Sequence, residues 1–578
     1  RFDTALPIDD VLGALTTALE STPNAVLVAP PGAGKTTRVP LALIDAPWRG
    51  TGRILVLEPR RLAARGAAAR MAASLGEPVG GRVGLRSRLD TRVSAATLVE
   101  VVTEGVFTRM ILADPALDGV AAVLFDEFHE RSLDADLGLA LALDAQAGLR
   151  PDLRLLVMSA TLDGARIAGR LATPAAPVIE SEGRAFAVAT EYLGRDPNLR
   201  IEDQMVAAIV RALRAETGSL LAFLPGQGEI RRVAERLESR GIGADVEIAP
   251  LYGAMDMRAQ DAAVRPAPPG RRKVVLATAI AETSLTIEGV RVVIDSGLAR
   301  VPRYEPDTGI TRLETVRVSR AAADQRRGRA GRTEPGVCYR LWDEPQTQSL
   351  TPFQRPEILD ADLSGLVLDC ADWGVADPAS LTFLDPPPGP ALAEARSLLS
   401  ALGALDGAGR ITARGKALSA LPLPPRLAAM IVAGGETGQA REAAELAALM
   451  TERGLGGSST DLTQRLDAFR RDRGGRAEEM RRMAAGWARQ VPAVGGPDAA
   501  APVARLVAFA YPERIAMARG APGQFLLANG RAAAVEPHDQ FARQPFLVVA
   551  DMTGKAAQGR ILSAAPLGED ELSDAFRE

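Results

Sequence analysis

The stretch Ala25-Val-Leu-Val-Ala-Pro-Pro-Gly-Ala-Gly-Lys-Thr-Thr37 decides the fold of the first third of this chain. It reads as a buried strand, a glycine loop and the start of a helix, and the N–H groups of such a loop form a cradle for phosphate. Lys35 can reach the β- and γ-phosphates of a nucleotide, and the Thr36 hydroxyl can ligate Mg²⁺. The loop pattern usually has glycine where Ala29 stands, so the match is imperfect.

The alternative is an ordinary glycine-rich turn between a strand and a helix. We disfavour it because the chain has only four lysines against 64 arginines, and one of these lysines occupies the position that phosphate chemistry needs. The residues predicted to bind the nucleotide in this loop are Pro31, Gly32, Ala33, Gly34, Lys35, Thr36 and Thr37.

A pair of carboxylates, Asp126-Glu127, follows the apolar run Ala121–Phe125. The carboxyl ends of parallel strands form the mouth of a sheet, where ligands bind. Asp126 is therefore predicted to hold Mg²⁺, and Glu127 to orient or deprotonate an attacking water. His129 is either a plain polar residue or a coupling residue, and its place beside the pair favours the second. The triplet Ser159-Ala-Thr161 can hydrogen-bond into this centre, although alone it is only a turn.

Arginines that can complete the site lie in Gln325-Arg-Arg-Gly-Arg-Ala-Gly-Arg332. A transferring phosphoryl group spreads negative charge that fixed guanidinium groups can stabilise. Arg329 and Arg332 are three residues apart, so a helix would project them from one face. The alternative is a solvated basic helix, which Gly328 and Gly331 disfavour because glycine destabilises a helix interior. We expect these glycines to pack closely against a neighbouring lobe.

Short apolar runs alternate with helical stretches over the first 345 residues, which is typical of parallel sheets covered by helices. Two α/β lobes of similar size are predicted, with a boundary near 182–184. The expected strands are Ala25–Ala29, Ile54–Leu57, Leu98–Val102, Ala121–Phe125 and Leu155–Met158, then Ala187–Tyr192, Leu220–Leu224, Val246–Ile248, Lys273–Ala277, Val292–Ile294 and Val337–Leu341. Later residues look helical, with a short strand-like piece at Arg410–Thr412. From Gln524 onward, β-like runs indicate a small barrel.

Composition limits the kind of protein. The chain has 578 residues, 47% of them hydrophobic and 24% charged, which excludes a disordered or fibrous protein. No apolar run is long enough to cross a bilayer. Two cysteines and two histidines exclude a disulfide framework and a multi-histidine metal site, and a reducing, cytoplasmic compartment is the simplest interpretation.

The net charge of −4 argues against a general polyanion binder, yet the charge is uneven along the chain. Residues 53–92 contain nine arginines and three acids (9 − 3 = +6), and residues 300–332 contain nine arginines and four acids (9 − 4 = +5). One basic area in each lobe can grip the phosphates of a nucleic-acid strand. Few aromatics, 4%, disfavour stacking platforms, so contact with the backbone without sequence readout is the better prediction.

The motifs, in this order, resemble those of the DEAH/DExH-box helicases of superfamily 2, most closely the bacterial HrpB-type ATP-dependent helicases. The resemblance covers residues 5 to about 440. It rests on APPGAGKTT, LEPRRLAAR (57–65), TEG (103–105), DEFHERS (126–132), SAT, FLPGQGEI (223–230), TAIAETSLTI (278–287), VIDSG (293–297) and QRRGRAGR. The departures are DEFH for DEAH, Ala279 for the usual Asn, and Val264 near a family aromatic that sandwiches the base.

This resemblance implies an α/β fold of two tandem RecA-like domains, 1–183 and 184–345. A winged helix (346–420), a helical bundle (421–510) and an OB-like β-domain (511–578) would follow. It also implies an ATP-dependent RNA helicase that uses ATP and Mg²⁺, moves 3′→5′ and separates RNA duplexes, with DNA as a second candidate. Because Val264 replaces the aromatic, we expect several nucleoside triphosphates to be hydrolysed. The rival interpretations are an NTPase that remodels nucleic-acid complexes without unwinding and a catalytically silent binding scaffold.

The resemblance also implies roles for single residues. Arg70 would stack on the adenine, Asp295 would belong to the nucleotide site, and Gln325 would help Glu127 to position water. A β-hairpin at Val301–Glu314 would split the duplex. The residues implied to touch the strand are Arg60, Arg61, Arg88, Thr103 and Thr283.

Overall fold

The computed structural model describes residues 5–88, 90–160, 163–183, 186–282, 287–305, 309–452, 454–492, 502–553 and 559–575. The chain divides into two compact units. The first comprises Arg1–Ala361 and Ala379–Pro388, and the second comprises Asp362–Pro378 and Gly389–Glu578. The segment 379–388 therefore belongs to the first unit, although the chain on either side of it belongs to the second.

The first lobe of the first unit is an eight-stranded sheet in the order β4-β3-β5-β2-β6-β7-β1-β8. Every neighbouring pair is parallel except β3 and β4. The strands are β1 (Asn24–Val28), β2 (Arg53–Glu58), β3 (Val83–Arg86), β4 (Thr91–Arg92), β5 (Val99–Thr103), β6 (Val120–Phe125), β7 (Arg154–Ser159) and β8 (Val178–Glu180). The five predicted strands are all present, and β3, β4 and β8 extend the sheet at its edges.

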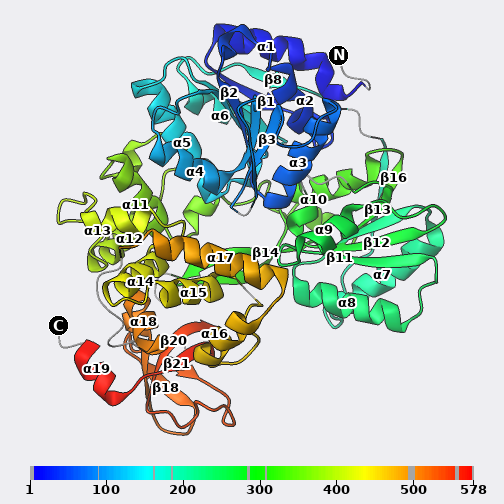
Figure 1. The fold of residues 1–578 in the computed structure, drawn as a ribbon. Coiled ribbons are helices and arrows are strands. Elements are labelled where there is room, and N and C mark those ends of the chain that lie inside the picture. Colours follow the sequence, from blue (N-terminus) through cyan, green and yellow to red (C-terminus); the bar gives the residue numbers. More distant parts are fainter. Residues whose placement is uncertain are drawn as a thin grey trace. The chain divides into compact units, whose positions relative to one another are not determined.

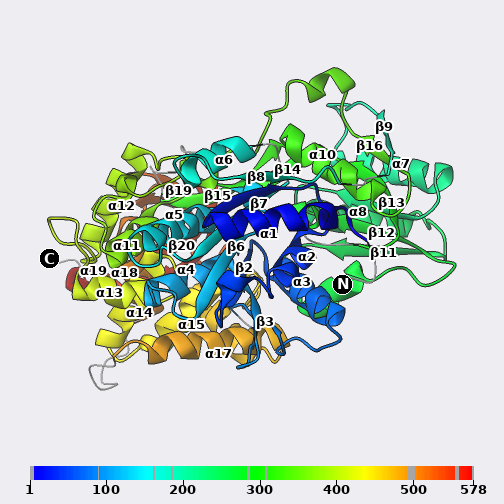
Figure 2. The same ribbon diagram turned by 90° about the horizontal axis from the view of Figure 1, so that it is seen from above.

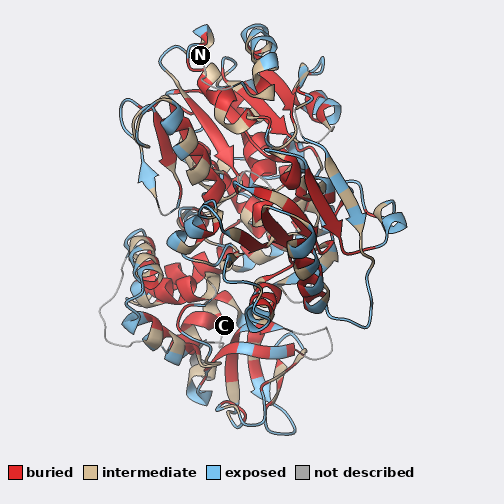
Figure 3. Cartoon of the chain, turned by 90° about the vertical axis from the view of Figure 1, so that its right-hand side faces the viewer, coloured by how far each residue is buried: buried red, intermediate tan, exposed pale blue. Residues whose placement is uncertain are grey.

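Helices cover both faces of this sheet, which is why its central strands are apolar on both sides (Figures 1 and 2). Alternate strand residues such as Leu27, Val56 and Leu124 form one buried cluster with the helices of one face. These helices are α1 (Leu12–Ser21), α2 (Lys35–Ala42) and α3 (Arg61–Ser74), and α4 (Glu104–Ala113), α5 (Leu133–Gly148) and α6 (Gly164–Leu171) cover the other face. Figure 3 shows the central strands buried, whereas exposed residues lie on the outer sides of helices and on some strands.

The second lobe is a six-stranded, fully parallel sheet in the order β11-β12-β10-β13-β16-β9. Its strands are β9 (Val188–Tyr192), β10 (Ser219–Phe223), β11 (Val246–Leu251), β12 (Arg272–Ala277), β13 (Val290–Asp295) and β16 (Gly336–Arg340). Its helices are α7 (Ile201–Ala215), α8 (Gln227–Ser239), α9 (Met257–Val264) and α10 (Arg320–Gly328). The antiparallel hairpin expected at Val301–Glu314 is present and longer, with strands β14 (Leu298–Glu305) and β15 (Ile310–Arg317).

The second unit is helical and contains, before its last helix, a closed barrel of order β17-β18-β19-β21-β20. Its helices are α11 (Ser364–Trp373), α12 (Gly389–Ala401), α13 (Ala413–Ser419), α14 (Pro425–Glu436), α15 (Ala440–Thr451), α16 (Leu462–Arg471), α17 (Gly475–Arg489), α18 (Val503–Ala510) and α19 (Glu569–Ala575). The barrel strands are β17 (Ile515–Ala518), β18 (Gln524–Leu527), β19 (Ala532–Ala534), β20 (Phe546–Thr553) and β21 (Gly559–Pro566).

The predicted fold class, two parallel α/β sheets followed by helices and a small β-barrel, is confirmed. The prediction of a strand-like piece at Arg410–Thr412 is wrong in detail, because this region forms only an isolated bridge between Leu405 and Ile411. Across the described ranges, the helices are all too short or too polar to serve as a membrane span.

Candidate nucleotide and nucleic-acid site

The glycine loop leads from the end of β1 into α2. Gly32 and Gly34 have φ of 86° and 96°, a conformation that glycine adopts without strain. A Cβ on Gly34 would also lie 2.6 Å from the Leu6 Cδ1 atom, so a side chain here would have to displace the end of Leu6. Ala29 needs no glycine, because it ends the strand in a regular way and donates a 2.9 Å hydrogen bond to the Ser159 carbonyl.

The two predicted carboxylates lie directly opposite the start of α2. Thr36 Oγ1 donates to Asp126 Oδ2 at 2.5 Å, and Lys35 Nζ lies 3.1 Å from Glu127 Oε1. Glu127 has a left-handed backbone with φ of 50°, a costly conformation that is typical of functional turns. The glycine loop, or P-loop (Ala29–Thr37), and the acidic motif (Asp126–Ser132) lie about 90 residues apart in the sequence. They therefore meet at one edge of the sheet.

Burial and neighbouring charges set the protonation of this centre. Burial raises the pKa of Glu127, but the charge and hydrogen bond of Lys35, together with the charges of His129 and Arg329, outweigh burial and hold the pKa at about 2. Burial lowers the pKa of Lys35, but Glu127 and Asp126 outweigh it, so this pKa lies above its usual value.

Sequence reasoning missed Glu58, which is fully buried at the end of β2. Burial and then the charge of Asp126 raise the pKa of Glu58 well above its ordinary value. Its place at a strand end in LEPRR was the available signal.

The residues present fit a magnesium ion that arrives with a nucleotide. Mg²⁺ in such sites is usually held by one or two carboxylates together with phosphate oxygens and water. Thr36 and Asp126 offer one hydroxyl and one carboxylate at hydrogen-bonding distance. In the part of the chain that the structure describes, no group of three or more His, Cys, Asp or Glu side chains forms a metal cage. The donor set therefore suits a metal shared with a phosphate ligand.

His129 links the acidic motif to the end of β7. Its Nδ1 accepts a 3.1 Å hydrogen bond from the Ala160 N–H, and its Nε2 lies 3.4 Å from Glu127 Oε2. Movement of Glu127 can therefore be passed to the Ser159-Ala160 turn. Thr161, the last residue of that triplet, lies outside the described residues.

The sequence predicts that Arg329 and Arg332, the two arginines that could stabilise the transferring phosphoryl group, project from one helix face. The structure differs, because they do not share a helix face. Helix α10 ends at Gly328, and Arg329–Gly331 form a 3₁₀ turn. Arg332 lies against the glycine loop, with its Nε 3.6 Å from the place where a Cβ on Gly32 would stand. Arg329 instead donates from Nε to the Glu282 carbonyl at 2.8 Å. In this structure Arg332 reaches the first lobe, while Arg329 is engaged within the second.

The packing expected of the two glycines is also corrected. A Cβ on Gly331 would lie 2.6 Å from the Phe186 carbonyl oxygen and from Val188 Cγ2, and both residues belong to the same lobe as Gly331. A Cβ on Gly328 would meet nothing within 4 Å. Close approach is therefore required at one glycine only, and its partner is the edge of its own sheet, not the neighbouring lobe.

The arginines around the glycine loop are poised for an anion. Burial lowers the pKa of Arg332 to about 10, with Glu127 opposing the shift and Arg70 adding to it. Burial, and then the charge of Arg332, lower the pKa of Arg329 well below its ordinary value. Burial also lowers the pKa of Arg70, which Glu58 partly offsets. An anionic ligand would relieve this crowding of buried cations. Gln325 lies on α10 and is half-buried.

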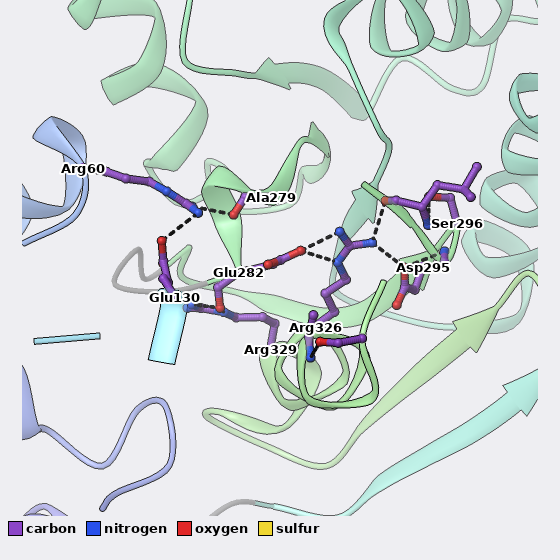
Figure 4. Close-up of polar contacts among 12 residues, drawn as sticks. Arg60, Glu130, Ala279, Glu282, Asp295, Ser296, Arg326 and Arg329 are labelled. Atoms are coloured by element: carbon purple, nitrogen blue, oxygen red, sulfur yellow. Dashed lines mark hydrogen bonds and ion pairs between the residues drawn. The ribbon is translucent and has the colours of Figure 1, made fainter. Parts of the chain in front are cut away.

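A buried ion-pair network fixes the second half of the site (Figure 4). Arg326 is fully buried, donates to Glu282 at 2.6 Å and to Asp295 at 2.7 Å, and lies over the ring of Phe223. Asp295, assigned to the nucleotide site by resemblance, contacts Arg326 and the Gly297 N–H in this structure. Sequence reasoning missed Arg326 and Glu282. Glu282 lies in the motif TAIAETSLTI and Arg326 in QRRGRAGR, and this place in a motif was the only signal of their role in the sequence.

The candidate nucleic-acid residues have different surroundings. Arg61 and Arg88 are exposed, and Thr103 is half-buried just before α4. Arg60 contacts Glu130 and the Ala279 carbonyl (Figure 4). Thr283 lies outside the described residues.

The two basic stretches carry less free charge than their sequences suggest. Arg53 and Arg86 both pair with the buried Glu100, which lies beyond the counted stretch. Arg300 pairs with Glu229, also outside its stretch. Charge counted along the sequence overstates the basic surface, because folding brings carboxylates from other segments.

Comparison with known proteins agrees with this geometry. The family described as DEAD/DEAH box helicase matches residues 12–168, and the helicase conserved C-terminal domain matches residues 203–334. The winged-helix helicase associated domain (HA2) matches residues 395–423. The two parallel sheets are thus RecA-like lobes, and the chain after them contains a winged helix.

Single relatives resemble the chain over nearly its whole length. The ATP-dependent RNA helicase HrpB of Escherichia coli (strain K12) is 47% identical over 570 residues, which cover 98% of this chain and 69% of the relative. A crystal structure titled E. coli DExH-box NTPase HrpB superposes with a TM-score of 0.86 at 46% identity, covering 99% of this chain and 70% of that one. A second, titled Escherichia coli DEAH/RHA helicase HrpB, gives a TM-score of 0.88 at 46% identity, covering 98% and 71%. The chain therefore belongs to the HrpB family of DEAD/DEAH box helicases.

Proposed function

We propose that this chain is an ATP-dependent RNA helicase of the DEAH type that hydrolyses nucleotide between its two RecA-like lobes. One observation carries the proposal. Lys35, Thr36, Asp126 and Glu127 meet at the mouth of the first sheet, and Arg332 of the second lobe lies against the same glycine loop. The E. coli relative, an ATP-dependent RNA helicase by name, supports the substrate class.

The chain's own residues divide the work as follows. Pro31 shapes the loop, and the N–H groups from Gly32 to Thr37 would bind the phosphates. Thr36 and Asp126 would hold Mg²⁺, which would neutralise charge on the reacting phosphate. Glu127, with Gln325, orients water and accepts its proton. Lys35 now neutralises Glu127, so its transfer to a bound phosphate would release this base. Arg329 and Arg332 stabilise the transferring phosphoryl group.

His129 passes the state of Glu127 to the turn at Ala160. Arg70 stacks on the base, and Asp295 supports the site through Arg326. We also propose that triphosphates other than ATP are hydrolysed, because Val264 is too small to sandwich a base.

Single-stranded RNA, or DNA as the second candidate, would cross both lobes along Arg60, Arg61, Arg88, Thr103 and Thr283. Opening and closing of the lobes would move the chain 3′→5′, and the hairpin β14–β15 would separate the duplex. We keep the domain limits 1–183, 184–345, 346–420, 421–510 and 511–578 and a cytoplasmic location as parts of this proposal. The rival is an NTPase that remodels complexes without unwinding.

The test compares Glu127→Gln with the wild type. The glutamine keeps size and hydrogen bonding but cannot accept a proton, so turnover should fall by about 10²- to 10⁴-fold while nucleotide binding persists. Rates with ATP, GTP, CTP and UTP measure base selectivity, and strand displacement on 3′- and 5′-tailed duplexes separates the helicase from the remodelling NTPase. Full turnover by Glu127→Gln would contradict the assigned base.

Lys35→Ala should also abolish turnover. Because it leaves Asp126 and Glu127 buried without their cation, it should lower the melting temperature as well. The double variant Lys35→Ala/Glu127→Gln should recover part of that stability without recovering turnover. Retained turnover in Lys35→Ala would refute the site.

A further inference from the structure

One guanidinium group connects three segments of the first unit. Arg60, the residue before α3, donates from Nη2 to Glu130 Oε2 at 3.2 Å and from Nη1 to the Ala279 carbonyl at 2.6 Å. Glu130 belongs to the acidic motif of the first lobe, and Ala279 belongs to the second lobe. Figure 4 shows Arg60 between these two partners. The side chains of Arg60 and Glu130 are 30% and 17% exposed, so the pair is shielded but still reached by solvent.

The first turns of α3 lie along the seam between the lobes. Leu62 is buried in a cluster otherwise built from the second lobe, including Phe223 and Ala277. Arg65 lies 3.2 Å from Asp261 of α9. Arg61, which directly precedes Leu62, is exposed. In this short stretch, Arg61 is therefore exposed to solvent, while Leu62 and Arg65 contact the second lobe.

Glu130 is mechanically tied to the reacting carboxylates. It lies three residues after Glu127, in a 3₁₀ turn, Phe128–Glu130, that has left-handed residues at both ends, Glu127 and Arg131. Phe128 is fully buried and fixes the middle of this turn. A turn with so little freedom moves as one piece, so a shift of Glu127 on nucleotide binding also shifts Glu130.

We propose that Glu130 is a positioning residue that holds Arg60 between the lobes and thereby couples nucleic-acid binding to closure of the nucleotide cleft. This inference rests on the proposed function. Glu130 touches neither nucleotide nor reacting atoms. It acts through Arg60, which among the described residues donates to Glu130 and to the Ala279 carbonyl and has further N–H groups that can bind a phosphate.

The experiment measures ATP turnover by the full chain with and without a single-stranded uridine oligonucleotide, together with binding of that oligonucleotide. Glu130→Gln should leave the basal rate unchanged. It should also bind RNA equally or more tightly, because it removes a carboxylate that competes with phosphate for Arg60. The kcat at saturating RNA should nevertheless fall by about tenfold, the size expected for loss of one charge-assisted contact. Glu130→Asp should recover part of the stimulation.

Glu77→Gln is the matched control, since it breaks an exposed Arg–Glu pair of the same lobe, to Arg82 at 2.7 Å. It should behave as the wild type. Full RNA stimulation in Glu130→Gln, or a loss confined to RNA affinity, would overturn the inference alone. If the wild type itself fails to turn over ATP with RNA, the proposed function fails and takes this inference with it. A general structural defect would instead lower the basal rate and the melting temperature of Glu130→Gln, and that outcome also counts against the inference.

Discussion

At the scale of single residues, we expect a bound triphosphate to become the ionic partner of cations that are buried in the nucleotide site. Lys35 is buried against Glu127, and Arg332 is buried beside the glycine loop with its pKa lowered to about 10. Both cations carry a desolvation cost that a triphosphate would offset. The site is therefore electrostatically incomplete without an anion, which gives the arginine a testable role.

Arg332→Ala should lower kcat by about 10³-fold while ATP binding changes only a few-fold, because a finger acts mainly on charge that develops in the transition state. Single-turnover rates and binding of a fluorescent nucleotide check this. Arg82→Ala, which removes an exposed arginine of the first lobe, is the control and should have no effect. Loss of nucleotide binding with an unchanged catalytic rate would argue against a finger.

At the scale of elements, burial decided what could be predicted. The central strands β1, β2, β6 and β7 are covered on both faces and read as continuous apolar runs, so the sequence indicated them. The edge strand β8 is only three residues long and mostly exposed, so it offered no such run. The sequence also predicted the meeting of the P-loop with Asp126, because both follow parallel strands of one sheet.

The contacts between distant segments could not be predicted. Arg326, Arg329 and Arg332 are alike in the sequence, yet one is clamped by Glu282, one binds a carbonyl and one reaches the P-loop. The break after Gly328 that separates their directions is a local change of helix type, which spacing alone does not reveal. Glu100 and Glu229 likewise neutralise arginines from outside the stretches whose charge was counted.

The junction of α4 and α5 should make stability depend on pH. Glu104, the first residue of α4, accepts a 2.5 Å hydrogen bond from Ser132, the N-cap of α5. Burial raises its pKa from 4.5 to about 8, although Ser132 opposes the shift. The neutral form is the one that folds, so this contribution is complete below the unfolded pKa and is lost as pH rises through about 8.

Glu104→Gln keeps the shape and cannot ionise. Its free energy of unfolding should match that of the wild type at about pH 5 and exceed it at about pH 8.5 by up to about 4 kcal/mol. Melting temperatures measured at both pH values check this. Glu77→Gln, at an exposed site, is the control and should gain nothing at high pH. Parallel pH profiles for Glu104→Gln and the wild type would show that Glu104 is ionised in the folded protein.

At the scale of the whole molecule, the chain passes between the two units three times, at 361/362, 378/379 and 388/389. Two segments of the first unit that lie next to these crossings contact the end of the acidic motif and the residue that follows it. The Glu357 N–H donates to the Arg131 carbonyl at 3.1 Å, and the Glu357 carboxylate accepts from the Leu133 N–H at 2.8 Å. Asp385 lies 2.7 Å from Arg131 and 2.5 Å from Arg166. Any shift of the acidic motif is therefore delivered to the segments that lead into the second unit.

Asp385→Asn should loosen the segment 379–388 from the first unit. Arg131 is nearly buried and keeps Asp136 as a partner, so the expected loss is about 1–3 kcal/mol, short of unfolding. Such local loosening raises the fraction of time that the segment is open, so subtilisin should cut within 379–388 faster under native conditions. Asp377→Asn is the matched control, because Asp377 pairs with Arg396 at 3.0 Å on the surface. Equal cleavage rates for wild type and Asp385→Asn would mean that the ion pairs of Asp385 do not hold this segment.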